Sequence, residues 1–166
     1  FANVDLIEEI SAGSEVAIPY HVALAQIMEA YTYITLVDYV GDVPYSQANQ
    51  FGDFPTPVLD AGEDVYAAQI ALLDTAIANL NEVSAVIPQD LFYGSFDADN
   101  WIAVANTLKL KAHLNMGNGG AISALLSENI IDNDDEDFQF NYSTSTSPES
   151  RSPIFQGNYP NGTGFY

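Results

Sequence analysis

A long, mostly apolar segment from Pro19 to Val40 most constrains what this chain can fold into. Its length exceeds that of ordinary strands, and its apolar residues recur at spacings of three and four, the period of a helix. Pro19 suits the first helical turn, and Gly41 suits the helix end. Neighbouring residues are also apolar or small, so we expect an inner helix buried over most of its circumference. Its stripe comprises Leu24, Ile27, Met28, Tyr31, Ile34 and Val37.

A second helix is predicted to begin near Glu63 and Asp64 and to continue to about Asn81. Acids in the first turn favour the positive end of the helix dipole. The segment before it, 41–62, mixes glycines, prolines and aromatics, which predicts a long packed loop. The apolar stripe of this helix is narrow and regular, and it comprises Tyr66, Ile70, Leu73, Ile77 and Leu80.

A third helix follows a connector at 82–98, in which Pro88 and Gly94 act as breakers. Either Asp97 or Asp99 can cap its start, and the glycines within 117–120 favour its end. Two helices of this length separated by a connector, each with an apolar stripe, resemble the helix pairs of solenoid proteins more than an enzyme core. The apolar face of the third helix comprises Trp101, Val104, Ala105, Leu108 and Ala112.

The remaining sequence predicts less regular structure. A short helix is expected from about Ala121 to Ser127, and Phe138, Phe140 and Tyr142 then alternate with polar residues at the period of a strand. Ser, Thr, Pro, Gly and Asn dominate beyond Ser143, which predicts little order. The expected hydrophobic anchors there are Ile154, Phe155, Tyr159, Phe165 and Tyr166.

The formal net charge is -20, from 23 acidic and 3 basic residues. Such a field repels phosphates and anionic lipid headgroups, which argues against a nucleic-acid partner. The chain has no cysteine, so disulfides and thiolate metal sites are excluded. Its hydrophobic content of 48% nevertheless predicts a folded domain.

No apolar run reaches the roughly 18 residues that cross a membrane as a helix. The chain starts at Phe1, without a lipidation cysteine or a basic leader. Any targeting segment is therefore expected to lie outside the sequence, and any membrane association would use a lipid anchor that is absent from it.

Three segments, in order, resemble the SusD/RagB family. Ala30-Tyr-Thr-Tyr-Ile-Thr-Leu-Val-Asp-Tyr-Val-Gly-Asp-Val-Pro-Tyr45 is similar to an aromatic helix followed by a Gly-Asp-hydrophobic-Pro-Tyr turn. Val65-Tyr66 with Leu72-Leu73-Asp74-Thr-Ala-Ile77 resembles a second family helix. The strongest likeness lies in Phe92-Tyr93-Gly94, Trp101 and Ala105-Asn106-Thr107-Leu108-Lys109-Leu110-Lys111. The resemblance spans about residues 24 to 160, although Ser152 departs from the histidine common before Pro153.

This resemblance implies an all-α fold of tetratricopeptide-like helical repeats with long irregular loops, here a fragment of a larger α-rich domain. Residues 1–142 would form the helical part, and residues 143–166 would form a loop-rich segment truncated from a larger carboxy-terminal part. Family members are surface lipoproteins that Bacteroidetes pair with TonB-dependent transporters.

The implied function is non-catalytic capture of extracellular oligosaccharides for a SusC-like TonB-dependent transporter, at the extracellular face of the outer membrane. Two alternatives stay open: a peptide-binding member of the family, and a helical-repeat scaffold that binds proteins. A groove with unpaired backbone groups would favour the peptide reading. One broad apolar surface would favour the scaffold.

Aromatic residues in the two long connectors are the candidate ligand contacts, because binding residues favour loops held by a rigid scaffold. The predicted substrate-binding residues are Tyr45, Phe54, Phe92 and Tyr93, within a wider set that also includes Phe51 and Phe96. Their rings can stack on the apolar faces of sugars. Trp101, Tyr31 and Tyr33 lie within predicted helices, so we expect them in the core.

Neither a cofactor nor a metal site is predicted. The run Asp132-Asn-Asp-Asp-Glu-Asp137 offers oxygen ligands that suit calcium, but it lacks EF-hand spacing and is better read as a solvated acidic turn. His21 and His113 lie far apart and outside any metal-binding motif. The sequence has no nucleophile motif of a known hydrolase, so we do not expect an enzyme.

Overall fold

A computed structural model of the chain describes residues 2–13, 18–147 and 150–158. Regular structure in these ranges is helical apart from isolated bridge residues, which include the pair Val43 and Asp60, so the predicted all-α class is confirmed. The elements are α1 (Ala2–Gly13), α2 (Pro19–Val40), α3 (Gly62–Leu80), α4 (Ala98–Asn115), α5 (Gly119–Leu125), the 3-10 helix η1 (Asp134–Glu136) and α6 (Pro153–Asn158).

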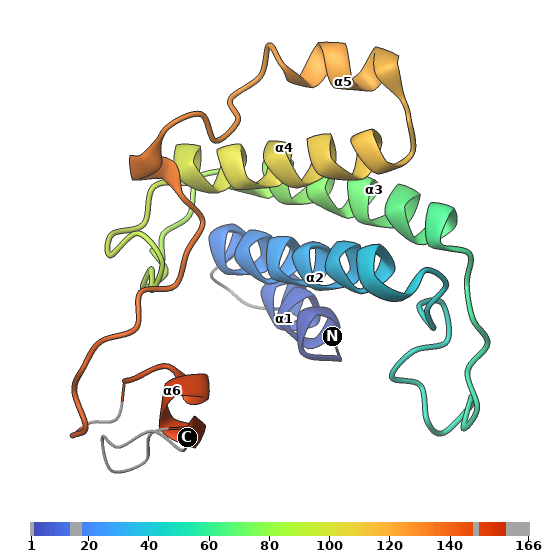
Figure 1. Cartoon of the computed structure of the whole chain (residues 1–166), viewed down its shortest axis with the longest axis horizontal. Coiled ribbons are helices and arrows are strands. Elements are labelled where there is room, and N and C mark those ends of the chain that lie inside the picture. Colours follow the sequence, from blue (N-terminus) through green and yellow to red (C-terminus); the bar gives the residue numbers. More distant parts are fainter. Residues whose placement is uncertain (1, 14–17, 148–149, 159–166) are drawn as a thin grey trace.

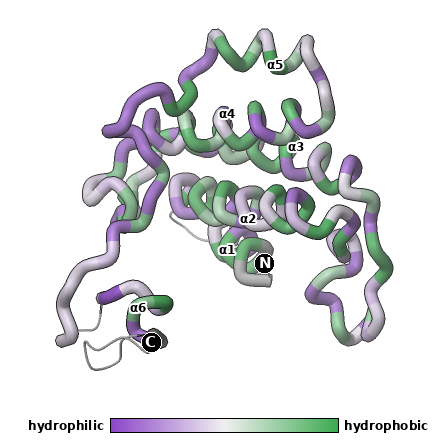
Figure 2. Tube along the Cα trace, in the orientation of Figure 1, coloured by the Kyte–Doolittle hydropathy of each residue, from purple (hydrophilic) through white to green (hydrophobic). Residues whose placement is uncertain are grey.

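The helices α2, α3 and α4 form the body of the molecule, in which successive helices run in opposite directions (Figure 1). α1 packs on α2, and α5 packs on α4. Loop 41–61 joins α2 to α3 at one end of this body, and loop 81–97 joins α3 to α4 at the other end. Downstream of η1 the chain leaves the body, and α6 stands apart from it. Figure 2 shows hydrophilic residues gathered between α5 and η1.

α2 has the predicted bounds, but its buried stripe differs from the predicted one. Pro19 occupies the first turn, and Gly41 ends the helix at a φ of 79°, where its N–H donates to the Val37 carbonyl. The buried side includes several small residues, whereas Met28 and Tyr31 are 36% and 41% exposed. The expectation of a core Tyr31 was therefore wrong, while Tyr33 lies in the core as predicted. The core-facing stripe is Ala23, Ile27, Ala30, Ile34 and Val37.

Small side chains let the helices approach closely. Ala23 and Ala30 of α2, Ala76 of α3, and Ala105 of α4 are all fully buried. At the start of α3, a Cβ on Gly62 would lie 2.8 Å from Cγ1 of Val37, so only glycine fits there without displacement. Large side chains fill the remaining space, led by Ile27, Ile34, Leu73 and Trp101.

Polar side-chain contacts cap α4 and join it to its neighbouring helices. Asp97 caps α4 by accepting a hydrogen bond from the Asp99 N–H, so the predicted cap is confirmed at the first of the two candidates. Lys109 of α4 forms an ion pair with Asp74 of α3 at 2.5 Å, and Lys111 forms one with Asp38 of α2 at the same distance. α4 is therefore tied to both neighbouring helices.

Several sequence expectations fail outside the three central helices. α1 was not predicted, and α6 lies in a segment where little order was expected. Phe138, Phe140 and Tyr142 form no strand, because ring-to-ring contacts rather than a partner strand engage this segment. Ile154 is 76% exposed instead of anchored, and Phe155 is 43% exposed with the Arg151 guanidinium 5.8 Å from its ring centre. The other predicted anchors, Tyr159, Phe165 and Tyr166, lie outside the described residues.

Two buried glutamines allow a matched test of core energetics. Gln26 donates to Glu8 of α1 at 2.7 Å and accepts from Asn79 of α3 at 3.0 Å. Gln69 of α3 is fully buried, and among the described residues neither its amide nitrogen nor its amide oxygen has a hydrogen-bond partner. A buried polar group without a partner destabilises the folded state.

We therefore expect Gln69→Leu to raise the free energy of unfolding by about 1–3 kcal/mol, because it removes two unsatisfied polar atoms at similar volume. Gln26→Leu should lower the free energy of unfolding by about 1–3 kcal/mol, because two hydrogen bonds are lost. Urea unfolding followed by the fluorescence of Trp101, the single tryptophan, measures both. A loss of stability in Gln69→Leu would contradict this expectation.

Asp38 gives the fold a defined acid sensitivity. Partial burial acts to raise the pKa of this carboxyl, but hydrogen bonds from Lys111, Tyr66 and Asn115 outweigh that effect and hold its pKa below the ordinary 3.8. The resulting stabilisation is present above pH 3.8 and is lost as the pH falls through the folded-state pKa. Asp38→Asn should destabilise the chain at pH 7 and reduce the loss of stability between pH 4 and pH 2. Urea unfolding of both chains across this pH range tests the prediction. An unchanged pH dependence in Asp38→Asn would contradict the role given to Asp38.

Candidate ligand-binding site

The four predicted ligand contacts do not come together. Tyr45 and Phe54 lie in loop 41–61, whereas Phe92 and Tyr93 lie in loop 81–97, at the opposite end of the helical body (Figure 1). A helix of the length of α2 spans about 33 Å, which exceeds the reach of a single sugar ring. The two loops are therefore separate candidate regions.

Loop 41–61 is long but closely organised. Val43 and Asp60 exchange backbone hydrogen bonds of 2.9 and 3.2 Å, which closes the base of the loop. The Asp60 carboxylate then accepts from the backbone N–H groups of Tyr45 and Ser46 at 2.8 and 2.9 Å, and from the Ser46 hydroxyl at 2.7 Å. These bonds hold the pKa of Asp60 below its ordinary value, so the carboxylate stays charged at physiological pH.

Further contacts order the rest of the loop. The Val58 N–H donates to the side-chain oxygen of Gln47 at 3.1 Å, and the Phe54 N–H donates to the Gln50 carbonyl at 2.7 Å. Asn49 adopts a φ of 61°, a left-handed conformation that asparagine tolerates. The loop thus presents its side chains from a fixed backbone.

The aromatic residues of this loop differ in exposure. Tyr45 packs edge-on against Tyr33 with ring centroids 4.8 Å apart, so it is part of the core wall. Phe54 is 37% exposed, and Phe51 is 79% exposed. Phe51 belonged to the wider set of loop aromatics but was left out of the predicted site. Its place in the Gln-Phe-Gly-Asp stretch, without apolar neighbours, was the sequence feature that could have indicated its exposure.

Phe92 and Tyr93 belong to an aromatic cluster around Trp101. Phe92 stacks on Phe138 at 4.6 Å and meets Trp101 edge-on at 5.6 Å, and the Tyr93 ring lies edge-on to Trp101 at 6.0 Å. The Trp101 indole N–H donates to the buried Asp90 carboxylate at 2.7 Å. The prediction that Trp101 is a core residue is confirmed, and both loop aromatics help to cover it.

Tyr93 also makes a specific polar contact. Its hydroxyl donates to the Glu136 carbonyl at 2.9 Å, which joins loop 81–97 to η1. Burial, with smaller contributions from Asp90, Glu136 and Asp137, raises the pKa of Tyr93 to about 12. The phenol is therefore neutral at physiological pH, as its donor role requires.

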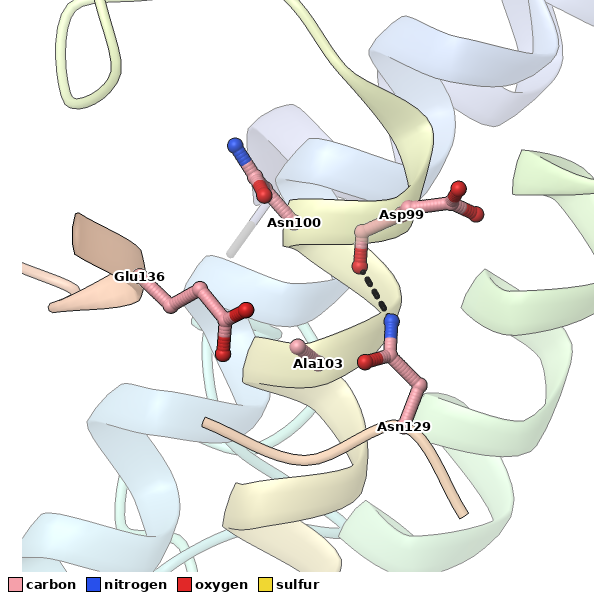
Figure 3. A pocket seen from close by; sticks show the side chains of 5 residues that line it. All are labelled: Asp99, Asn100, Ala103, Asn129 and Glu136. Atoms are coloured by element: carbon pink, nitrogen blue, oxygen red, sulfur yellow. Dashed lines mark hydrogen bonds between the residues drawn. The ribbon is translucent and has the colours of Figure 1, made fainter. Parts of the chain in front are cut away.

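A polar cleft of about 360 Å³ lies beside this cluster (Figure 3). Ala103 of α4 forms its floor, and the side chains of Glu136 and Asn129 approach that floor from the segment after α5. Asn129 donates to the backbone carbonyl of Asp99 at 2.9 Å, while the side chains of Asp99 and Asn100 point away from each other. The described residues that line the cleft offer amide and carboxylate groups and include no aromatic ring.

A groove of about 590 Å³ follows α3, α4 and α5. Ile70, Ile77, Ile102 and Leu125 supply its apolar lining, and the Asp74–Lys109 ion pair lies among its other lining residues. The lining is therefore mixed rather than the broad apolar surface that a protein-binding scaffold would favour.

The acidic run Asp132 to Asp137 forms a turn around η1. Its side chains are exposed except for the half-buried Glu136, and the Asn133 side chain accepts from the Asp135 N–H. In the described part of the chain, no three His, Asp or Glu residues are placed to hold a metal ion. None of the helices in these ranges is long and apolar enough to cross a membrane.

Comparison with known proteins places the chain in a family. Residues 2–157 match the profile of a SusD-like family described as starch-binding and associating with the outer membrane. No curated protein matches the chain.

Three solved structures illustrate the likeness. A SusD homologue from Bacteroides uniformis has 23% identity and a TM-score of 0.75, over 96% of this chain and 33% of that protein. A SusD/RagB family protein from Bacteroides thetaiotaomicron has 26% identity and a TM-score of 0.72, over 99% and 34%. A chitin-binding SusD homologue from Flavobacterium johnsoniae has 20% identity and a TM-score of 0.68, over 97% and 39%.

The chain thus spans about a third of the length of these solved relatives. The family profile covers nearly all of it, and the helical arrangement agrees with the solved homologues. Both findings confirm the resemblance seen in its aromatic helix, its Gly-Asp-Val-Pro-Tyr turn and its Ala-Asn-Thr-Leu-Lys-Leu-Lys helix. This chain belongs to the SusD-like family.

Proposed function

We propose that this chain takes part in non-catalytic capture of extracellular oligosaccharides, with Phe51 and Phe54 of loop 41–61 as the stacking surface. The observation that carries the proposal is the exposure of these two rings on a backbone fixed by Asp60. Family membership supports a carbohydrate ligand, since the family is described as starch-binding and a structural relative as chitin-binding.

The whole protein would work at the extracellular face of the outer membrane, held by a lipid anchor, and would pass its ligand to a SusC-like TonB-dependent transporter. The family description, which names association with the outer membrane, supports this location. The earlier division into a helical part, 1–142, and a loop-rich part, 143–166, is retained within this proposal. The proposed loop lies in the helical part.

Ring exposure supports a narrower set of proposed ligand contacts than the four predicted residues. Phe54 remains a proposed ligand contact, and Phe51 joins it. Tyr45, Phe92 and Tyr93 are proposed to act indirectly, because their rings pack against Tyr33, Phe138 and Trp101. A single aromatic stack on a sugar contributes on the order of 1 kcal/mol, so one ring alone gives weak binding. Several contacts along an oligosaccharide would be needed for useful affinity.

Removal of the two exposed rings tests their proposed role as glycan contacts. Phe51→Ala and Phe54→Ala should each weaken oligosaccharide binding roughly fivefold, the equivalent of about 1 kcal/mol. Calorimetry against a panel of starch and chitin oligosaccharides measures the change. Val83→Ala is the matched control, because Val83 is 95% exposed and lies outside the loop. Retained affinity in both phenylalanine variants would reject loop 41–61 as the site, and a folded chain that binds no glycan would reject the proposed function.

The role of Asp60 can be separated from direct contact. Asp60→Ala removes three hydrogen bonds within the loop but leaves both rings in place. We expect glycan affinity to fall roughly three- to tenfold, because binding would then have to order the loop. Ser46→Ala, which removes only the hydroxyl bond, should have a smaller effect. Equal glycan affinities in the unmodified chain, Asp60→Ala and Ser46→Ala would show that the order of loop 41–61 does not matter for binding.

A further inference from the structure

A separate cavity of about 410 Å³ lies between Tyr142 and α6. Tyr142 and Phe155 are its aromatic lining residues, and they are 54% and 43% exposed. Thr144, Thr146 and Ser152 contribute hydroxyl groups, and Arg151 contributes a guanidinium. This combination of aromatic faces, hydroxyls and a cation differs from the polar cleft beside α4.

Local hydrogen bonds hold these residues together. The Ser143 N–H donates to the Ser150 carbonyl at 2.9 Å, which brings the two sides of the segment together. On the other side, the Gln156 N–H donates to the Ser152 carbonyl at 2.9 Å, and the Gln156 side chain donates to the Arg151 carbonyl at 2.5 Å. Phe140 meets Tyr142 edge-on at 4.9 Å and also meets Phe92, so ring contacts link Tyr142 to the cluster around Trp101.

Arg151 gives this cavity its chemical character. The chain has three basic residues, and Arg151 is the one among the residues that line this cavity. The Arg151 guanidinium lies 5.8 Å from the centre of the Phe155 ring. A guanidinium carries five N–H donors in a planar fork, so it can bind a carboxylate while it keeps contacts within the chain.

We propose that this cavity is a second saccharide subsite, specific for a sugar that carries a carboxylate, that is, a uronic acid. The sugar ring would lie against Tyr142 and Phe155, and its carboxylate would accept hydrogen bonds from Arg151. The charge of -20 repels anions at long range, but the Debye length of about 8 Å at physiological salt limits that repulsion. Recognition therefore depends on contact with Arg151. This inference rests on the proposed function only in that the ligand is a glycan.

The test compares oligomers of galacturonic acid with their methyl esters, which keep the ring and linkage but lose the charge. Nuclear magnetic resonance of the isotope-labelled chain at about 0.15 M salt follows the aromatic signals of each site separately. The free acid should shift the signals of Tyr142 and Phe155 with saturation, and the ester should bind there at least roughly tenfold more weakly.

Variants locate the contacts. Arg151→Lys keeps the charge but loses the fork, and it should weaken binding of the acid but not of the ester. Tyr142→Ala should weaken both. Tyr39→Ala is the control, because this tyrosine is 83% exposed at the end of α2. Equal shifts by acid and ester would overturn the carboxylate specificity.

The two proposals fail separately. If glycans shift the signals of Phe51 and Phe54 while those of Tyr142 and Phe155 stay unchanged, the second subsite is rejected and the proposed function stands. If the acid shifts Tyr142 and Phe155 while no glycan of the panel affects Phe51 or Phe54, the subsite stands and the assignment to loop 41–61 is rejected.

Discussion

The hydrogen bond from Trp101 to Asp90 holds together the end of the helical body where most distant segments meet. The Asp90 carboxylate accepts from the indole at 2.7 Å and from the backbone N–H groups of Phe92 and Tyr93 at 2.8 and 2.9 Å. One buried carboxylate thereby fixes the start of α4 and the turn that supplies two of its covering rings. Phe138 reaches the same indole from a segment downstream of η1. A buried charge is tolerated here because three donors satisfy it.

The central helices could be predicted because local signals coincide with the tertiary structure. Pro19 and Gly41 bound α2, the acids at 63 and 64 lie in the first turn of α3, and Asp97 caps α4. The buried face of α2 was harder, because its apolar residues surround the helix and periodicity alone does not show which side meets α3. The alternation of Phe138, Phe140 and Tyr142 predicted a strand, but these rings pack on Trp101 and on one another. Alternating hydrophobicity does not reveal whether a partner strand exists.

The choice of loop aromatics as ligand contacts stays a prediction. The structure shows that Phe92 and Tyr93 close the core around Trp101 and that Tyr45 packs on Tyr33. Sequence cannot separate an aromatic that seals a core from one that faces solvent, because both occur in loops with the same composition. The difference arises from long-range contacts, such as the bond from Tyr93 to Glu136, 43 positions away.

Because both lysines pair with carboxylates of the helical body, they leave the surface of the molecule with an excess of negative charge. Lys109 and Lys111 neutralise Asp74 and Asp38, so their charges serve the packing of α4 against α3 and α2. Most of the other carboxylates that the structure describes are exposed, with Asp90 as a buried exception, and Arg151 is the other basic side chain of the sequence. Two copies that approach each other through the helical body therefore meet like charge, which disfavours self-association at low ionic strength. Dense packing of many copies would require cations from the medium between them.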